Sequence, residues 1–351
     1  PGGRRAVFAA RGELLTVPQQ HGDVRDLTHS PSAHDKHPAF SPDGARVAFV
    51  SDASGEEQIW LVDHRGDEPP RRLTDGLAAM LYQPSWSPDG ARLAFGDKDG
   101  VLRVCDVATG ELTVVADEPR GQIRDHVWSP CSGHLAFSMT DATDVPRLYV
   151  WSLADRRLRP VSRPLANDTS PAFDARGERL FFVGLRGFQP RLPAAYEWDF
   201  QLDRCFGVYA LALRKDLPPL FGARSDEATA PVADDAKDDA APAFDGPIAI
   251  DFDGLADRVE PVPLPLDNYA GLAVAGDHLL YAVRGGSYYG RSSDRPTTLH
   301  AFSLAEREAA ELASDVAGWA VSADRRRVLI RSGDRFVVAA ATTEGKDGQE
   351  T

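Results

Sequence analysis

One short sequence recurs along the chain at a nearly fixed interval. Ser41–Phe49 reads SPDGARVAF, and Ser87–Phe95 reads SPDGARLAF. Weaker copies follow at Ser129–Phe137, Asp174–Phe182 and Ser322–Ile330. A unit of turns and short strands repeated about every 42 to 46 residues is typical of a β-propeller. The repeat predicts an architecture but no chemistry, because propellers serve many unrelated functions.

Each unit is predicted to contain four short strands, a to d. In the second unit these are Pro38–Phe40, Arg46–Val50, Gln58–Val62 and Arg71–Thr74. The Ser-Pro-Asp-Gly turn separates strands a and b, since proline presets φ and glycine accepts a left-handed conformation. Large apolar residues recur six positions before strand b, where we expect them to pack between adjacent blades. They are Phe40, Trp86, Trp128, Phe173, Leu272 and Val321.

Seven b–c hairpins give the number of blades. The double interval before the sixth hairpin is explained by an extended b–c excursion, Gly184–Arg204, and an acidic low-complexity insertion, Ala223–Pro247, rather than by an eighth blade. We therefore expect an all-β, seven-bladed propeller of four-stranded antiparallel blades over residues 1–341. Residues 342–351 are expected to be a polar tail or linker. The chain starts with strand b and is predicted to end after strand c, giving six a and six d strands and a ring closed without full overlap of terminal strands.

Strand b is predicted to start with a basic residue in every unit. If the a strands line the channel, these residues and one neighbour form a collar on one face of the disc. A ring of like charge over a low-dielectric channel attracts an anion or the terminal carboxylate of a peptide. The alternative is an exposed arginine inherited through blade duplication, since one exposed Arg–carboxylate pair contributes only ~0.2–1 kcal/mol. The Arg/His collar consists of Arg5, Arg46, Arg92, His134, Arg179, His278, Arg326 and Arg327.

Composition limits the class of protein and its partners. A formal net charge of −14 argues against nucleic acid, and no apolar stretch is long enough for a membrane helix. Three cysteines without regular spacing fit a reducing compartment, so a cytoplasmic location is expected. We expect neither a cofactor nor a metal. The nearest approach to a metal cluster, His29, His34, Asp35 and His37, has no established zinc spacing.

The acidic insertion allows two interpretations. It carries seven carboxylates against one lysine between residues 225 and 245, amid alanine and proline. Such a composition is typical of a solvated loop. The alternative is an acidic segment that docks or gates.

Two further stretches carry a resemblance to a known family. They are Ile250–Gly271, IDFDGLADRVEPVPLPLDNYAG, and Val208–Phe221, VYALALRKDLPPLF, which the acidic segment follows. Together with the turns, they resemble the seven-bladed propeller of the tricorn protease family over nearly the whole chain. The Ser-Pro-Asp-Gly turn by itself is also shared by TolB-type propellers and by propellers of prolyl-oligopeptidase-like enzymes.

The resemblance implies a function for the chain. Tricorn-type proteases are large cytosolic serine peptidases that trim oligopeptides, with a six-bladed propeller, a seven-bladed propeller and catalytic regions flanking a PDZ-like domain. Their seven-bladed propeller is regarded as a filter and access route with basic residues at its channel. By position, Arg46, Arg92, Arg326 and Arg327 match that basic channel. The family's catalytic serine and histidine lie beyond the propeller.

We therefore expect a non-catalytic propeller that admits oligopeptides to a serine peptidase site elsewhere in the parent chain. The expected partners are oligopeptides and the remaining domains of the parent peptidase, whose full-length form leaves a homo-oligomer open. The first alternative is a TolB-like scaffold that binds a protein at its rim. The second is a free-standing hydrolase propeller with a metal in its channel.

Overall fold

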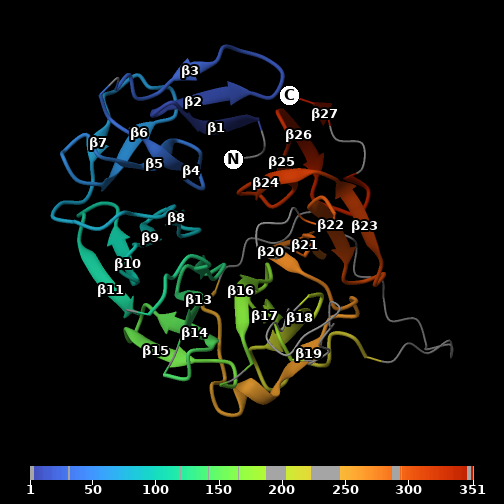
Figure 1. Ribbon diagram of the computed structural model, residues 1–351. Helices are drawn as coiled ribbons and strands as arrows, with labels where there is room; N and C mark the ends of the chain where they lie inside the picture. Colours follow the sequence, from blue (N-terminus) through green and yellow to red (C-terminus); the bar gives the residue numbers. More distant parts are fainter. Residues whose placement is uncertain are drawn as a thin grey trace, which may run out of the picture.

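Seven antiparallel sheets are arranged as blades around a central axis (Figure 1). The computed structural model describes residues 4–30, 32–118, 120–140, 142–164, 166–186, 203–222, 246–286, 293, 295–345 and 349–350. One short 3₁₀ helix, Leu255–Asp257, is the helical element of these residues. No described helix has the length and apolar character needed to cross a membrane. The fold is thus the predicted all-β, seven-bladed propeller.

The strands follow one another outward from the axis within each blade (Figure 1). Blades 1 to 4 comprise β1 (Arg5–Ala10), β2 (Glu13–Pro18), β3 (Arg25–Asp26); β4 (Lys36–Phe40), β5 (Arg46–Ser51), β6 (Gln58–Asp63), β7 (Arg71–Arg72); β8 (Ser85–Trp86), β9 (Arg92–Gly96), β10 (Val101–Asp106), β11 (Leu112–Asp117); and β12 (Val127–Trp128), β13 (His134–Thr140), β14 (Pro146–Ser152), β15 (Arg157–Pro160). Blades 5 to 7 comprise β16 (Asp168–Phe173), β17 (Arg179–Gly184), β18 (Gly207–Ala212), β19 (Val259–Pro261); β20 (Tyr269–Ala275), β21 (His278–Val283), β22 (Thr298–Ser303), β23 (Ala309–Ala313); and β24 (Val316–Val321), β25 (Arg327–Ser332), β26 (Arg335–Ala340), β27 (Gln349–Glu350).

The long interval between the fifth and sixth hairpins holds a single blade. β17 pairs with β18, and β18 pairs with β19, so the predicted excursion lies between strands b and c and the insertion between c and d. Residues 187–202 of the excursion and 223–245 of the insertion lie outside the described residues. The prediction that the interval holds no eighth blade is confirmed.

The ends of the chain differ from prediction in one strand. The first described sheet has three strands and lacks strand a, as expected. The last blade has all four, because Gln349–Glu350 pairs with β26 at Val337 and Val338. The prediction that the chain ends after strand c is therefore wrong, and the described blades have seven d strands rather than six. No described strand from the end of the chain joins the first blade, so the ring closes without overlap.

Apolar side chains between adjacent blades form the core. In one cluster, Ala48, Val50 and Ile59 of blade 2 pack with Leu93 and Phe95 of blade 3. The described residues form six such clusters, and each cluster joins two consecutive blades. The six apolar residues predicted to pack between blades each belong to or contact a different cluster, which confirms their role. They are Phe40, Trp86, Trp128, Phe173, Leu272 and Val321.

The interface between the last and first blades is built differently. None of the six buried clusters of the described residues joins these two blades. An edge-to-face contact links Phe8 of β1 to Phe336 of β26, with ring centroids 4.6 Å apart. The two ends of the chain lie at this seam (Figure 1). The ring therefore has six well-packed interfaces and one with a smaller apolar contact.

Candidate functional site

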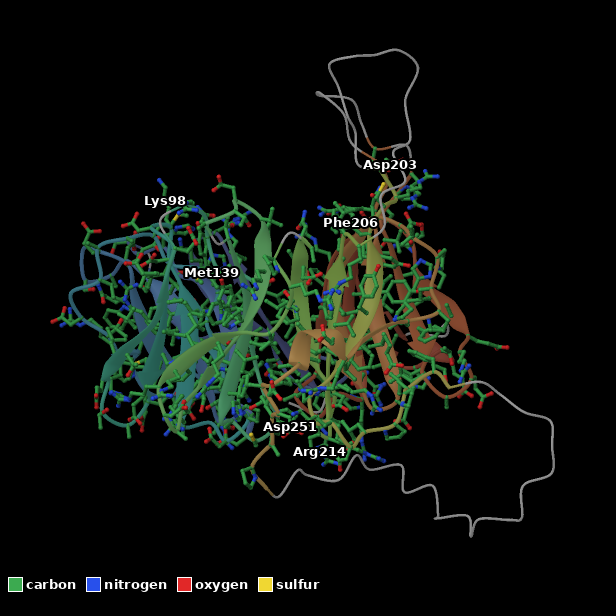
Figure 2. All side chains as sticks on the ribbon, turned by 90° about the horizontal axis from the view of Figure 1, so that it is seen from below. Lys98, Met139, Asp203, Phe206, Arg214 and Asp251 are labelled. Atoms are coloured by element: carbon green, nitrogen blue, oxygen red, sulfur yellow. The ribbon has the colours of Figure 1, made fainter. Side chains whose placement is uncertain are left out.

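The collar residues are at the predicted strand positions. The second strand of each full blade, and β1 in the first blade, begins at the expected basic residue, including His278 and Arg327 in the last two blades. In blade 5, Arg179 pairs with Ala212, the last residue of β18. Figure 2 places Arg214, two residues later, on one face of the disc together with Asp251, whereas Asp203 and Phe206 lie at the opposite face. We call the face where the b strands begin the collar face.

Two collar residues, Arg5 and Arg179, form hydrogen bonds within the chain. The Arg5 Nη2 group donates hydrogen bonds to the Thr16 carbonyl at 3.1 Å and to the Asp23 carbonyl at 2.8 Å. Arg179 is buried, with an exposed fraction of 8%, and its Nη2 group donates to the Pro218 carbonyl at 2.8 Å. These guanidinium groups satisfy backbone carbonyls, so their side chains are held within the fold.

Arg46 and Arg92 are partly engaged at the interfaces of their blades. The Arg46 guanidinium lies 5.8 Å from the ring centroid of Trp86, in the next blade, which gives a cation–π contact. Arg92 lies 3.5 Å from the Asp89 carboxylate of its own turn. Both side chains are half-buried. They contribute positive charge to the collar face, but each already has an attractive partner.

The fourth blade carries a thiol on this face. Its turn reads SPCSG, so Cys131 occupies the place of Asp43 and Asp89 in the preceding turns. The Ser129 hydroxyl lies 3.3 Å from the Cys131 sulfur, as Ser41 contacts Asp43. Burial acts to raise the pKa of Cys131, but hydrogen bonds from His134, Ser129 and two backbone amides outweigh it and lower the pKa to about 6. At neutral pH the sulfur is therefore an anion beside the collar residue His134.

Burial weakens the contribution of histidine to the charge of this face. His278 is half-buried, and burial lowers its pKa although Asp277 and Glu344 act to raise it. It is therefore neutral at pH 7. The collar is consequently not a ring of seven equivalent charges.

The same effect predicts how stability depends on pH. Burial lowers the pKa of His37, His126, His278 and His300 in the folded chain. The contribution of these histidines to the free energy of unfolding is complete above the pKa of about 6.5 that they have in the unfolded chain. This contribution is lost as the pH falls from that value toward the lower pKa of the folded chain. Denaturation between pH 7.5 and 5.5 should show the free energy of unfolding falling, by up to about 1.4 kcal/mol per pH unit for each histidine. His278→Gln should reduce the slope, and a flat profile would contradict the prediction.

Exposed basic residues gather where the ring closes. Arg326 and Arg327, at the start of β25, are exposed and line a cavity of about 660 Å³ with Arg4 and His21 of the first blade. Asp324 is the one acidic side chain among its described lining residues. Gln19, Gln20 and Ala340 complete the wall. Of the collar positions, the seam thus holds the two most exposed arginines beside an open volume.

The histidine cluster near residue 30 has ordinary structural partners. The Ser30 hydroxyl donates to the buried Asp35 carboxylate at 2.5 Å, and the His34 amide donates to Asp52 at 2.7 Å. No group of three or more His, Cys, Asp or Glu side chains in the described part of the chain is placed to hold a metal ion. Asp125 and His126, which precede β12, make contacts between blades. Asp125 accepts a hydrogen bond from the Ser170 amide at 2.7 Å, and His126 contacts the Ala94 carbonyl at 3.1 Å.

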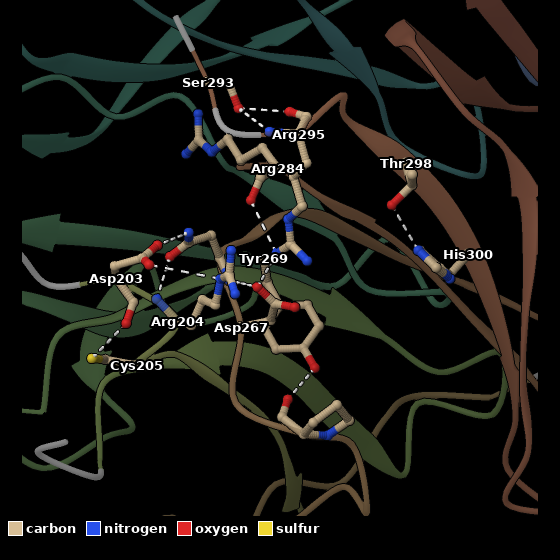
Figure 3. Close-up of polar contacts among 12 residues, drawn as sticks. Asp203, Arg204, Cys205, Asp267, Tyr269, Arg284, Ser293, Arg295, Thr298 and His300 are labelled. Atoms are coloured by element: carbon tan, nitrogen blue, oxygen red, sulfur yellow. Dashed lines mark hydrogen bonds and ion pairs between the residues drawn. The ribbon is translucent and has the colours of Figure 1, made fainter. Parts of the chain in front are cut away.

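A second polar cluster lies on the opposite face (Figure 3). The Asn268 side chain donates to Asp203 at 2.6 Å and accepts from the Arg204 amide at 2.8 Å. Arg295 forms an ion pair with Asp267 and donates to the Arg284 carbonyl (Figure 3). These contacts join the described ends of the b–c connections of blades 5 and 6. The cluster is internally paired and is best explained as an anchor for those connections.

The sequence repeat did not predict a role for two residues on the collar face. Cys131 was counted only as one of three cysteines, although its alignment with Asp43 and Asp89 was available. Arg325 is not among the eight residues of the predicted collar. It stands where the turns of blades 2, 3 and 5 have glycine, and it adopts a left-handed φ of 56°.

Comparisons with known proteins agree with this architecture. "Tricorn protease homolog 1" of Streptomyces coelicolor is 27% identical over 361 residues, covering 99% of this chain and 34% of that protein. The crystal structure of the tricorn protease matches with a TM-score of 0.81 at 16% identity, covering 99% of this chain and 33% of that one. A Mycobacterium tuberculosis puromycin-hydrolyzing peptidase matches with a TM-score of 0.58 at 16% identity, covering 95% of this chain and 46% of that one. At these identities the structural matches show the fold alone.

The family follows from the sequence match. The chain spans about a third of the length of the Streptomyces relative and of the tricorn protease structure. Residues 1–342 match the family described as the tricorn protease second beta propeller domain. Because this match covers nearly the whole chain, the protein belongs to the family of second β-propeller domains of tricorn proteases.

Proposed function

We propose that this chain is the non-catalytic access propeller of a tricorn-type serine peptidase. Oligopeptides enter along its axis and pass to an active site in another part of the parent protein, in the cytoplasm. The proposal rests on the family match together with one observation, the cavity at the seam. There Arg4, Arg326 and Arg327 face a single described carboxylate, Asp324.

The mechanism is electrostatic steering of the peptide carboxylate. An exposed Arg–carboxylate pair contributes only ~0.2–1 kcal/mol, so several arginines must act together. A group of like charges beside a concave surface raises the local concentration of an anion and its rate of association. Arg46 and Arg92 add to this field at longer range. No observation favours a protein-binding rim, since the exposed large apolar side chains of the described residues, Val24, Met80 and Val114, lie on β11 and two separate loops.

Binding of a fluorescent hexapeptide at low salt tests the proposal. The peptide with a free C-terminal carboxylate should bind more tightly than its C-terminal amide, and added salt should remove the difference. Arg326→Glu with Arg327→Glu should slow association of the free acid by about tenfold. The matched control is Arg46→Glu with Arg92→Glu, which should have a smaller effect because neither residue is among the described lining residues of the cavity at the seam.

The outcome distinguishes electrostatic steering of the peptide carboxylate from basic residues that were inherited through blade duplication and have no role in binding. Equal affinity for acid and amide, or equal loss in the two double variants, would contradict a carboxylate site at the seam. Thermal melts of both variants establish that the ring remains folded.

A further inference from the structure

The cavity at the seam has one wall from the first blade and one from the last. In blade 1, the Gln19 amide donates to the Arg4 carbonyl at 2.9 Å, which extends the pairing of β1 with β2 by one step. In blade 7, the Ala341 amide donates to the Arg326 carbonyl at 3.0 Å, which extends the pairing of β25 with β26 in the same way. Both walls are therefore held by backbone hydrogen bonds at corresponding ends of their blades.

The loop that carries the rest of the first wall is also fixed. Gln20 and His21 line the cavity after the end of β2, and the loop continues to Asp23. The Arg5 Nη2 group donates to the Asp23 carbonyl at 2.8 Å and to the Thr16 hydroxyl at 3.1 Å. Arg5 thus ties this loop to β2, so this wall of the cavity is shaped before a ligand arrives.

Positive charges lie on both sides of the cavity. Arg4 belongs to the first wall, and Arg326 and Arg327 belong to the second. Asp324, the one carboxylate of the described lining, accepts hydrogen bonds from the Ser322 hydroxyl at 2.5 Å and from the Arg326 amide at 3.1 Å, so it is held within its own turn. Like charges on opposite sides of an interface repel each other. In the absence of an anion, these arginines therefore act against closure of the ring.

The seam has little apolar contact to offset this repulsion. The described residues form no buried apolar cluster between the first and last blades, where Phe8 and Phe336 make an edge-to-face contact. Each of the other six interfaces has such a cluster. An anion between the two walls would replace repulsion by attraction at the interface with the smallest apolar contact.

The lining residues indicate the chemical class of that anion. Guanidinium groups bind phosphate oxygens through paired N–H donors, and the amide side chains of Gln19 and Gln20 are neutral donors beside them. Ala340 is the one apolar residue of the described lining, which has no phenylalanine, tyrosine or tryptophan on which an organic ring could stack. The volume of about 660 Å³ lies in the range of small-molecule sites and can hold several linked phosphate groups. A short chain of phosphates fits this wall better than a nucleoside or an apolar molecule.

We propose that the seam cavity binds a short polyphosphate anion, which contacts Arg4 on one wall and Arg327 on the other and so clips the ring closed. The same chemistry is present in a free phosphate ion, but a chain has several charged groups and can engage both walls at once. Since the proposed function places peptide carboxylates in this cavity, the anion would also compete with them and regulate access. The competition rests on the proposed function, whereas the clip does not.

Binding measurements test whether the anion bridges the seam. Isothermal titration calorimetry, at an ionic strength fixed with sodium chloride, compares tripolyphosphate with orthophosphate. Tripolyphosphate should bind about tenfold more tightly, because it engages both walls. Arg4→Gln and Arg327→Gln should each weaken its binding about fivefold. The control is Arg71→Gln, which changes an exposed arginine on β7 of blade 2 and should have no effect. Equal affinity for the two anions, or a loss in the variant of one wall only, would overturn the bridge.

Unfolding tests the repulsion across the cavity. Without the anion, Arg4→Gln should leave the equilibrium constant of unfolding unchanged or lower it, because the replacement removes one of the like charges. Tripolyphosphate at ten times its dissociation constant for the unmodified chain should lower that constant about tenfold, and about threefold in Arg4→Gln. A rise in the constant for Arg4→Gln without the anion would contradict the repulsion from which the proposal starts.

Hydrogen exchange locates the effect of the anion. Tripolyphosphate should slow amide exchange in β1, β2, β25 and β26 about fivefold and leave β9 and β10 of blade 3 unchanged. Protection on one side of the seam only, or equal protection in all blades, would overturn the clip.

Competition with the peptide separates the two proposals. Saturating tripolyphosphate should slow association of the free-acid hexapeptide about fivefold relative to sodium chloride at the same ionic strength. An unchanged rate would overturn regulation by competition. If the chain binds tripolyphosphate as expected but no hexapeptide, the proposed function fails and the clip stands. If the hexapeptide binds and tripolyphosphate does not, the clip fails and the proposed function stands.

Discussion

Replacing Phe95 by alanine is expected to lower the free energy of unfolding by about 3–5 kcal/mol. Phe95 has an exposed fraction of 0% and lies in the cluster between blades 2 and 3. Its removal would leave a cavity bounded by two sheets, which are paired along their strands and cannot close on it without breaking register. Urea denaturation followed by fluorescence and by circular dichroism measures the loss and establishes whether the two transitions coincide.

The matched control is the seam. Phe336 is half-buried and meets Phe8 edge to face, so Phe336→Ala should cost about 1–2 kcal/mol. The difference between the two replacements reflects six interfaces with buried clusters and one without. Equal losses would show that the seam is as well packed as the other interfaces, contrary to our description of it.

Removing the carboxylate of Asp168 is expected to cost about 3–5 kcal/mol. Its side chain is fully buried and accepts hydrogen bonds from Arg186 at 2.7 and 3.2 Å. Arg186 also lies over the rings of Phe182 and Tyr209, at 5.1 and 5.2 Å. Asp168→Ala would leave this guanidinium against apolar surface without its partner. Chemical denaturation at pH 7 measures the effect.

An exposed ion pair supplies the control for Asp168. Arg163 and Asp257 are paired with 65% of each side chain exposed, so Asp257→Ala should change the free energy of unfolding by less than about 1 kcal/mol. Because burial raises the pKa of Asp168, Asp168→Asn, which keeps the shape without the charge, should cost less than Asp168→Ala. Similar losses in the free energy of unfolding for Asp168→Ala and Asp257→Ala would contradict the larger effect expected for the buried pair.

The arrangement of the collar shows how far a repeat predicts a site. Register alone placed Arg46, Arg179 and Arg327 at the first residue of strand b, and the structure has them there. Their environments differ in ways that register does not encode. Arg179 is buried against Pro218, which lies in the long connection between β18 and β19 of blade 5. Arg327, in contrast, is exposed beside the first blade.

The last strand shows a similar limit. Gln349 and Glu350 lack the apolar alternation that marks a strand, so the sequence predicted a tail. An outer strand of two residues is specified by the free edge of β26, whose backbone groups it pairs with. That edge exists only after the blade has formed.

The repeat in the sequence predicts the number of blades, the start of each b strand and the residues that pack between blades. These follow from local rules, since turn chemistry and strand alternation act over a few residues and the repeat averages out exceptions. The exposure of each arginine and the contact of Arg325 in blade 7 with Phe173 in blade 5 depend on the tertiary structure. Charge and burial at a site depend on residues distant in sequence, and closure of the ring is what brings those residues together.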